Sequence, residues 1–259
     1  MILLNDQNPD IVPDKLRNPI NFKVLAIIAA LVIGFHILVN VSEDSDLYVY
    51  SFSMLIPLSV SIFGFITAKK YSGTAVYSKA YIMLGAAFML MFFAELTYFV
   101  YEQFLDLDPY PSIADVFFFF FYPLIVGYLI VNLKFFAVKI HKSALSIILG
   151  IPVITTLIYL NLTLSDFGSF DFYYGMIFVA SASFTLGLAL QTARIFKGGL
   201  IGTAWLVLVI GIILNAIGDT WYYYDEVIGE YSLDDPVNLC WYAAYLLILY
   251  SLFKHKKAL

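Results

Sequence analysis

The stretch KAYIMLGAAFMLMFFAELTYFVYEQFLDLDPYPSIADVFFFFFYPLIVGYLIVNLK (79–134) holds two long apolar runs that are joined by an acidic break. Basic residues stand at its two limits, Lys79 and Lys134, and the break YEQFLDLDPYPSIAD (101–115) has none. A helix needs roughly 20 apolar residues to cross a hydrocarbon core of about 30 Å, and each run is that long. The stretch therefore predicts two membrane-spanning helices that meet at an acidic loop.

The rest of the chain continues this plan. Of its 259 residues, 62% are hydrophobic and only 13% are charged, whereas soluble domains carry about 25% charged residues. The runs lack the alternating ten-residue pattern of barrel strands, so we predict an all-α, polytopic membrane bundle in one integral domain, 1–259. The eight expected transmembrane helices are 22–41, 47–68, 77–103, 114–138, 143–163, 169–192, 199–225 and 236–253.

The basic residues indicate the orientation of the bundle. All fourteen Lys and Arg residues fall on one side of the eight-span topology, and the four breaks on the other side contain none. The basic residues are Lys15, Arg17, Lys23, Lys69, Lys70, Lys79, Lys134, Lys139, Lys142, Arg194, Lys197, Lys254, Lys256 and Lys257. Because cytoplasmic loops are rich in Lys and Arg, we expect a cell-membrane protein with both termini cytoplasmic. The lipid bilayer is the predicted partner, and the net charge of −5 argues against nucleic acid.

The two halves of the chain match each other at a nearly constant offset. The matched pairs are Asp46 with Asp171 and Thr67 with Thr192 (125 apart), Glu95 with Asp219, Tyr98 with Tyr222 and Glu102 with Glu226 (124 apart), and Asp115 with Asn238 and Tyr122 with Tyr245 (123 apart). These matches predict two parallel four-helix repeats, about 19–138 and about 143–253, related by an axis along the membrane normal. The alternative is chance similarity, because a chain with 20 Tyr and 24 Phe residues matches itself easily.

Acidic and aromatic residues recur near the outer ends of the third and seventh spans. Glu95 lies roughly 24 Å along its helix from Lys79, at about 1.5 Å per residue, which places it in the outer half of the bilayer. Ionisable side chains at such depth face protein or a water-filled cavity. We therefore predict an outward-facing acidic and aromatic pocket between the repeats. Its candidate ligand-binding residues are Glu95, Tyr98, Asp115, Asp219, Tyr222 and Asn238.

Several of these residues also have simple structural interpretations. Asp115, in PSIAD, suits a helix N-terminus, as do Asp46 and Asp171. Tyr and Trp favour the membrane interface in any case. The remaining outer acids are interpreted as solvated loop charge that makes the approach negative: Glu102, Asp106, Asp108, Asp225, Glu226, Glu230, Asp234 and Asp235.

The sequence predicts no catalytic residue, no metal site and no cofactor. His36 is the single histidine within a span, and an intramembrane metal hydrolase would need several ligands at that depth. An intramembrane enzyme is therefore disfavoured.

The stretch AELTYFVYEQFLDLDPYPSIADVFFFFFYPLIVGYLI (94–130) resembles multi-pass membrane modules at the N-termini of prokaryotic diguanylate cyclases, phosphodiesterases and histidine kinases. The resemblance rests on Pro111, Ser112 and Asp115 before an aromatic span, and on Tyr122-Pro123-Leu124. The stretch GDTWYYYDEVIGEYSLDDPVNLCWYAAYLL (218–247) is similar to the companion segment, although Asn238 stands where those modules usually have an acid. The resemblance implies a membrane sensor input. No kinase or cyclase sequence accompanies it here, so we expect a stand-alone form that signals through a separate cytoplasmic or membrane partner.

Three functions remain open at this point. The first is a sensor or ligand-binding protein with an outward-facing pocket. The second is a cation or small-molecule transporter, which is less favoured because the cytoplasmic halves of spans three, four, seven and eight hold few polar residues. The third is an accessory subunit of a larger membrane complex.

Overall fold

The computed structural model describes residues 20–42, 45–74, 76–136, 142–195, 202–228, 231–232 and 234–257. Within these ranges the chain forms eight α-helices and no strand, which confirms the all-α prediction. The helices are α1 (Phe22–Val41), α2 (Ser45–Lys70), α3 (Tyr77–Val100), α4 (Ile113–Phe136), α5 (Lys142–Leu162), α6 (Phe170–Ile195), α7 (Gly202–Ile228) and α8 (Asn238–Lys257). A π-helical turn, Tyr101–Leu105, extends α3, and a short 3₁₀ turn, Leu164–Asp166, follows α5. The helices agree with the predicted spans to within a few residues.

Seven of these helices, α1 to α7, are long and apolar enough to cross a membrane. By its described residues the helix α8 is not one of them, although it has 20 residues in all. It begins with Asn238, carries Trp241 and three tyrosines, and ends in KHKK (254–257), so its apolar stretch is shorter than those of the others.

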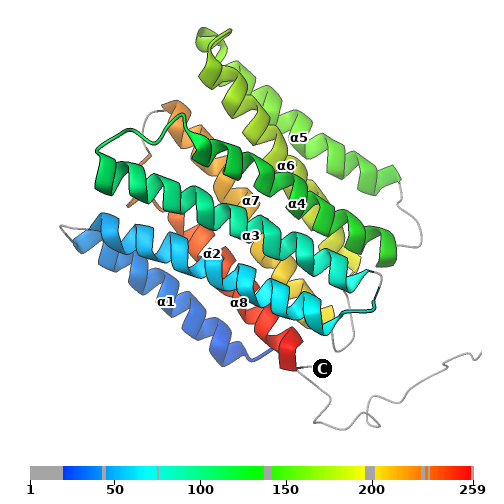
Figure 1. The fold of residues 1–259 in the computed structure, drawn as a ribbon. Helices are drawn as coiled ribbons and strands as arrows, with labels where there is room; N and C mark the ends of the chain where they lie inside the picture. The colour runs from blue at the N-terminus through cyan, green and yellow to red at the C-terminus, as the bar shows by residue number, and fades with distance from the viewer. Residues whose placement is uncertain are drawn as a thin grey trace, which may run out of the picture.

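Six of the helices form a closed ring (Figure 1). Along the ring, α2, α3, α4, α6, α7 and α8 each pack against the next helix, and α8 packs against α2. The helix α1 lies outside the ring against α8 and α2, and α5 lies outside it against α6.

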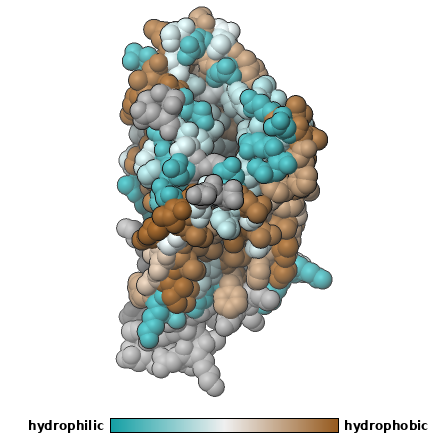
Figure 2. All heavy atoms as spheres, turned by 90° about the vertical axis from the view of Figure 1, so that its left-hand side faces the viewer, coloured by the Kyte–Doolittle hydropathy of each residue, from teal (hydrophilic) through white to brown (hydrophobic). Residues whose placement is uncertain are grey.

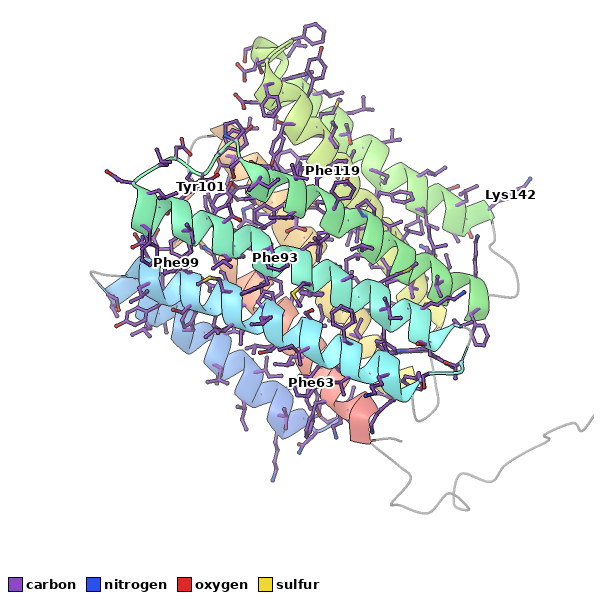
Figure 3. All side chains as sticks on the ribbon, viewed as in Figure 1. Phe63, Phe93, Phe99, Tyr101, Phe119 and Lys142 are labelled. Carbon is purple, nitrogen blue, oxygen red and sulfur yellow. The ribbon has the colours of Figure 1, made fainter. Side chains whose placement is uncertain are left out.

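The outer surface of the bundle is strongly apolar. Only 17% of the apolar window of α1 and 11% of that of α5 are buried, whereas 56% is buried in α6 and α7. Phe93 and Phe119, both labelled in Figure 3, are 41% and 38% exposed. Exposing such a surface to water costs about 25 cal/mol per Å², a cost that lipid removes. The fold is therefore consistent with a membrane location.

The charged residues separate to opposite ends of the bundle. Lys69 and Lys70 end α2, Lys142 begins α5, and Arg194 lies in the last turn of α6. The first turns of α2, α4 and α6 carry Asp46, Asp115 and Asp171. Because successive helices run antiparallel, the first group lies at one end, here the basic end, and the second at the other, the acidic end; Lys142 and Tyr101 mark the two ends in Figure 3. Lys15, Arg17, Lys139 and Lys197 lie outside the described residues.

Aromatic side chains fill the ring in its basic half. This aromatic cluster consists of Tyr71, Tyr77, Tyr81, Tyr128 and Trp205, from α3, α4, α7 and the turn after α2. The rings of Tyr71 and Tyr81 stack with centroids 5.7 Å apart, and the indole N–H of Trp205 donates a hydrogen bond to the hydroxyl of Tyr81. Buried leucines pack around the cluster: Leu84, Leu129, Leu208 and Leu252.

A glycine allows α7 and α8 to approach closely. A Cβ atom at Gly211 would lie 2.6 Å from Cγ1 of Ile248 and 2.9 Å from the carbonyl oxygen of Ala244. Small residues at helix contacts are typical of membrane bundles, because close backbones gain van der Waals contact that lipid cannot replace.

We predict that Gly211→Ala lowers the stability of the bundle, because the Ala244 backbone must move away from the new methyl group. The expected loss is about 1–3 kcal/mol, as for other overpacked cores. Gly34→Ala in α1 is the matched control, since nothing lies within 4 Å of its added Cβ. Thermal unfolding of both variants in detergent checks this, and equal melting temperatures would contradict the close packing of α7 on α8.

Candidate functional site

A cavity of about 650 Å³ lies at the acidic end, inside the ring. All six ring helices line it, with Tyr50 from α2, Glu95 from α3, Asp115 from α4, and residues of α6, α7 and α8. Figure 2 looks onto this end of the molecule, where hydrophilic side chains gather around a hollow. Small-molecule sites typically measure about 300–1,000 Å³, so the cavity has the size of such a site.

The six residues predicted from the sequence all line this one cavity. Glu95, Tyr98 and Asp115 come from the first half of the chain, and Asp219, Tyr222 and Asn238 come from the second. The structure therefore brings together residues that lie up to 143 positions apart in the sequence, the separation of Glu95 and Asn238. That these residues bind a ligand stays a prediction.

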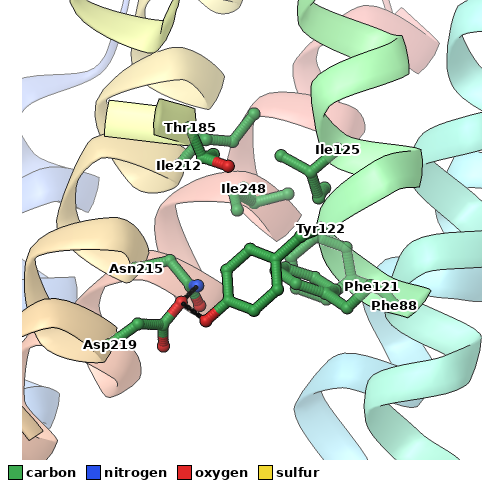
Figure 4. A pocket seen from close by; sticks show the side chains of 9 residues that line it. All are labelled: Phe88, Phe121, Tyr122, Ile125, Thr185, Ile212, Asn215, Asp219 and Ile248. Carbon is green, nitrogen blue, oxygen red and sulfur yellow. Dashed lines mark hydrogen bonds between the residues drawn. The ribbon is translucent and has the colours of Figure 1, made fainter. Parts of the chain in front are cut away.

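Asp219 is held by three hydrogen bonds from three helices. Its Oδ2 accepts from the hydroxyl of Tyr122 on α4 at 3.1 Å and from the amide of Asn215 on α7 at 2.8 Å (Figure 4). Its Oδ1 accepts from the indole N–H of Trp241 on α8 at 2.8 Å. Asp219 is 9% exposed, and this set of donors compensates the burial of its carboxylate. Asp219 therefore joins α4, α7 and α8 at the floor of the cavity.

A second, much smaller cavity lies beside this network (Figure 4). Its volume is about 10 Å³, and it shares Phe121, Tyr122 and Asp219 with the large cavity. Asn215 also lines it, and the Oδ1 atom of this buried amide accepts no hydrogen bond from the described residues. The space suffices for about one water molecule.

Glu95 differs from Asp219, its match in the second half. It lines the large cavity, yet its carboxylate accepts no hydrogen bond and forms no ion pair with any residue that the structure describes. The sequence accounts for two of the three missing donors: Met91 is 124 positions before Asn215, and Phe118 is 123 positions before Trp241. Neither of these side chains donates a strong hydrogen bond. The two acids are therefore not equivalent, as the matching alone would suggest.

Asp115 has both a structural position and a place in the cavity. Its Oδ2 accepts the backbone N–H of Ser112 at 2.6 Å, while the Ser112 hydroxyl accepts the N–H of Ala114 at 3.1 Å. This reciprocal arrangement caps the start of α4. The other carboxylate oxygen accepts a hydrogen bond from the hydroxyl of Tyr174 on α6, so the cap also ties α4 to α6.

Asp171 is not the residue that caps α6. The hydroxyl of Ser169 accepts the backbone N–H of Phe172 at 3.0 Å and so caps this helix. Asp171 lines the cavity and accepts a hydrogen bond from the hydroxyl of Tyr110 at 2.6 Å. Burial, together with the hydrogen bond to Asp171, raises the pKa of Tyr110, so its hydroxyl keeps its proton.

Three of the loop acids that the sequence assigns to solvated charge also line the cavity, and two of them, Asp108 and Glu226, are exposed to solvent. Glu102, Asp108 and Glu226 line the cavity, and Glu102 accepts a hydrogen bond from the hydroxyl of Tyr50 on α2. Glu230 lies outside the described residues. Among the described lining residues, eight are acidic and none is basic, namely Glu95, Glu102, Asp108, Asp115, Asp166, Asp171, Asp219 and Glu226. A cavity lined by one sign of charge concentrates ions of the opposite sign.

Sequence reasoning missed several aromatic residues of the cavity. Tyr50, Tyr174, Tyr231 and Trp241 line it alongside the predicted Tyr98 and Tyr222. In a chain with 20 tyrosines, interface tyrosines and cavity tyrosines look alike. Trp241 carried a usable signal, since it is one of three tryptophans and lies three residues after Asn238.

Comparisons with protein-family models, with curated proteins and with solved structures gave no match. The functional argument therefore rests on the residues and the geometry of the cavity.

We predict that Tyr122→Phe destabilises the bundle, because it removes one of the three donors to the buried Asp219 carboxylate. The expected loss is about 1–3 kcal/mol. Tyr242→Phe is the matched control, because the buried hydroxyl of Tyr242 has no hydrogen-bond partner among the described residues. Its removal is expected to leave stability unchanged or to raise it slightly. Thermal unfolding of the two variants side by side measures the difference, and an equal loss in both would count against the Asp219 network.

Proposed function

We propose that this protein is a multi-pass cell-membrane protein that binds a small ligand in the cavity at its acidic end and acts as a sensor. One observation carries the proposal. The six residues that the sequence predicts to bind a ligand, three from each half of the chain, line a single cavity of about 650 Å³. The resemblance to sensor input modules points the same way. The signal then passes to a separate cytoplasmic or membrane partner.

The proposed topology has eight spans, with the acidic end outside and both termini inside. The packing of α8 supports it as the eighth span, because α8 lies in the ring between α7 and α2 and runs antiparallel to α7. The start of α1 lies next to the end of α8, where the backbone N–H of Asn21 donates to the hydroxyl of Tyr250 at 2.9 Å. The basic residues at this end favour the cytoplasmic side.

The contacts between helices support the proposed parallel repeats, about 19–138 and about 143–253. The helix α4 of the first half packs on α6 of the second, and α8 of the second half packs on α2 of the first. The sequence matches pair α2 with α6 and α4 with α8, so these two contacts are equivalent. Such reciprocal contacts are typical of a twofold axis along the membrane normal. The helices α1 and α5 depart from this symmetry, since α1 packs on α8 and α2 whereas α5 packs mainly on α6.

The interior of the basic half supports sensing over transport. A transporter needs a polar path to the other side of the membrane, and here the ring is filled by the aromatic cluster and by buried leucines. Tyr81 and Tyr128 are at most 1% exposed. A ligand that enters from the acidic end therefore meets a closed floor.

We predict that compounds that bind the cavity stabilise the protein and are not transported. In lipid nanodiscs, a screen of small molecules of mixed charge should yield compounds that raise the melting temperature. At a concentration of 100 times its Kd, such a compound raises the free energy of unfolding by about 2.7 kcal/mol. Ser53→Trp, which fills the cavity from α2, should abolish the shifts. Leu55→Trp is the control on the same helix, because Leu55 is 59% exposed on the outer surface.

The same compounds should not accumulate in proteoliposomes. If the compounds accumulate in proteoliposomes of the native protein but not of the Ser53→Trp variant, the protein is a transporter and the sensor proposal is wrong. A screen in which no shift depends on residue 53 would contradict ligand binding in the cavity altogether.

We predict that the acidic end faces the outside of the cell. In a Cys240→Ser background, a membrane-impermeant maleimide should label Asp234→Cys, in the loop before α8, on intact cells. It should label Lys142→Cys, at the start of α5, only after permeabilisation. The reverse pattern would invert the proposed orientation.

A further inference from the structure

We propose that the ligand is a small organic cation, a protonated amine on an aromatic or apolar body, and that Glu95 is its counter-ion. This inference rests on the proposed function, because it names the chemical class that the same cavity would take. Four features of the cavity carry it.

The first feature is the sign of the charge. Eight acidic residues line the cavity, and no Lys, Arg or His is found among the described lining residues. An anionic ligand would be repelled and would find no basic partner, whereas a cation is attracted from solution into the cavity.

The second feature is that four of the tyrosines that line the cavity already donate their hydroxyl protons to acids. The hydroxyls of Tyr50, Tyr110, Tyr122 and Tyr174 donate to Glu102, Asp171, Asp219 and Asp115, respectively. These tyrosines are therefore not available as donors to a carboxylate or phosphate ligand. They also hold four of the acids in place, so the acids do not compete with one another for a single cation.

The third feature is that Glu95 offers the cavity a carboxyl group whose oxygens accept no hydrogen bond from any residue that the structure describes. Glu95 has no hydrogen-bond partner within the described part of the chain, and the Oδ1 atom of Asn215, in the adjoining small cavity, has none either. Asn215 is 3% exposed, so this oxygen is shielded from bulk solvent. A ligand that satisfies Glu95 must donate hydrogen bonds, and an ammonium group donates up to three. A charge-assisted hydrogen bond to Glu95 is roughly twice as strong as one between neutral groups.

The fourth feature separates an organic cation from a metal ion. In the ranges that the structure describes, no three His, Cys, Asp or Glu side chains converge as a metal ion requires. The acids are spread around a wide cavity, which aromatic rings also line. The ring of Tyr222 contacts those of Tyr231 and Trp241, with centroids 4.7 Å and 5.7 Å away. Such rings bind an organic cation through their faces and its apolar body through contact area.

The test uses three probes of nearly equal size and different charge: the cation of 1-naphthylmethylamine, the neutral alcohol 1-naphthalenemethanol and the carboxylate anion 1-naphthaleneacetate. Each is titrated by calorimetry into the full-length protein in nanodiscs at pH 7. The amine should bind at least about tenfold more tightly than the alcohol, a difference of roughly 1.4 kcal/mol, and the acetate should bind most weakly.

Glu95→Gln should reduce the affinity for the amine to that for the alcohol and leave the affinity for the alcohol unchanged. Asp234→Asn is the matched control: Asp234 lies at the same end of the bundle but does not line the cavity, so this variant should bind all three probes as the native chain does. If Glu95→Gln fails to fold, the order of the three affinities in the native protein is sufficient to test whether the ligand is a cation.

Equal affinity for amine and alcohol, a preference for the acetate, no binding of the amine, or full amine binding by Glu95→Gln would each overturn the assignment. These results are distinguishable from a failure of the proposed function. If neutral or anionic compounds give melting shifts that Ser53→Trp abolishes, the cavity binds a ligand and only the cation class is wrong.

Discussion

A carboxylate within the apolar thickness of a membrane must be hydrogen-bonded or must face water, and this constraint organises the acidic end of the bundle. Asp219 meets it through hydrogen bonds with Tyr122, Asn215 and Trp241, which come from three different helices. The ring closes around these bonds at the cavity floor. Lipid tails are as apolar as the helix surfaces, so apolar contact drives helices together weakly, and buried polar bonds gain importance.

The aromatic residues have different roles at the two ends of the ring. In the basic half, the aromatic cluster around Tyr81 and Trp205 fills the interior and closes it. In the acidic half, tyrosine rings line the cavity while their hydroxyls bind acids, as Tyr50 binds Glu102 and Tyr174 binds Asp115. A tyrosine suits this second position because its body is apolar and its tip is polar. The result is a cavity that holds many carboxyl groups without a basic residue among its described lining.

Glu95 and Asp219 illustrate how matched positions acquire different roles. Both acids lie near the outer end of a long helix, and both line the cavity. Asn215, one helical turn before Asp219, and Trp241 on α8 both donate hydrogen bonds to Asp219. The positions that match these two donors around Glu95 hold Met91 and Phe118. One carboxylate is thereby built into the fold, and the other is left open to the cavity. The third donor to Asp219, Tyr122, is matched by a tyrosine, Tyr245, so the two substituted neighbours account for two of the three hydrogen bonds.

The sequence by itself determined the all-α fold, the limits of the helices to within a few residues and the composition of the acidic end. These features depend on local patterns: apolar runs of the right length, turns rich in Asp, Pro and Gly, and charges that gather between runs. The sequence also predicted the six candidate residues of the cavity, because ionisable and polar residues are scarce inside apolar helices. Only the tertiary structure decided which acids are hydrogen-bonded and which are not, since a hydrogen bond such as that of Tyr122 with Asp219 joins residues 97 positions apart. It also decided that Glu102, Asp108 and Glu226 line the cavity and that the basic half is closed, because both depend on how six helices pack around a common centre.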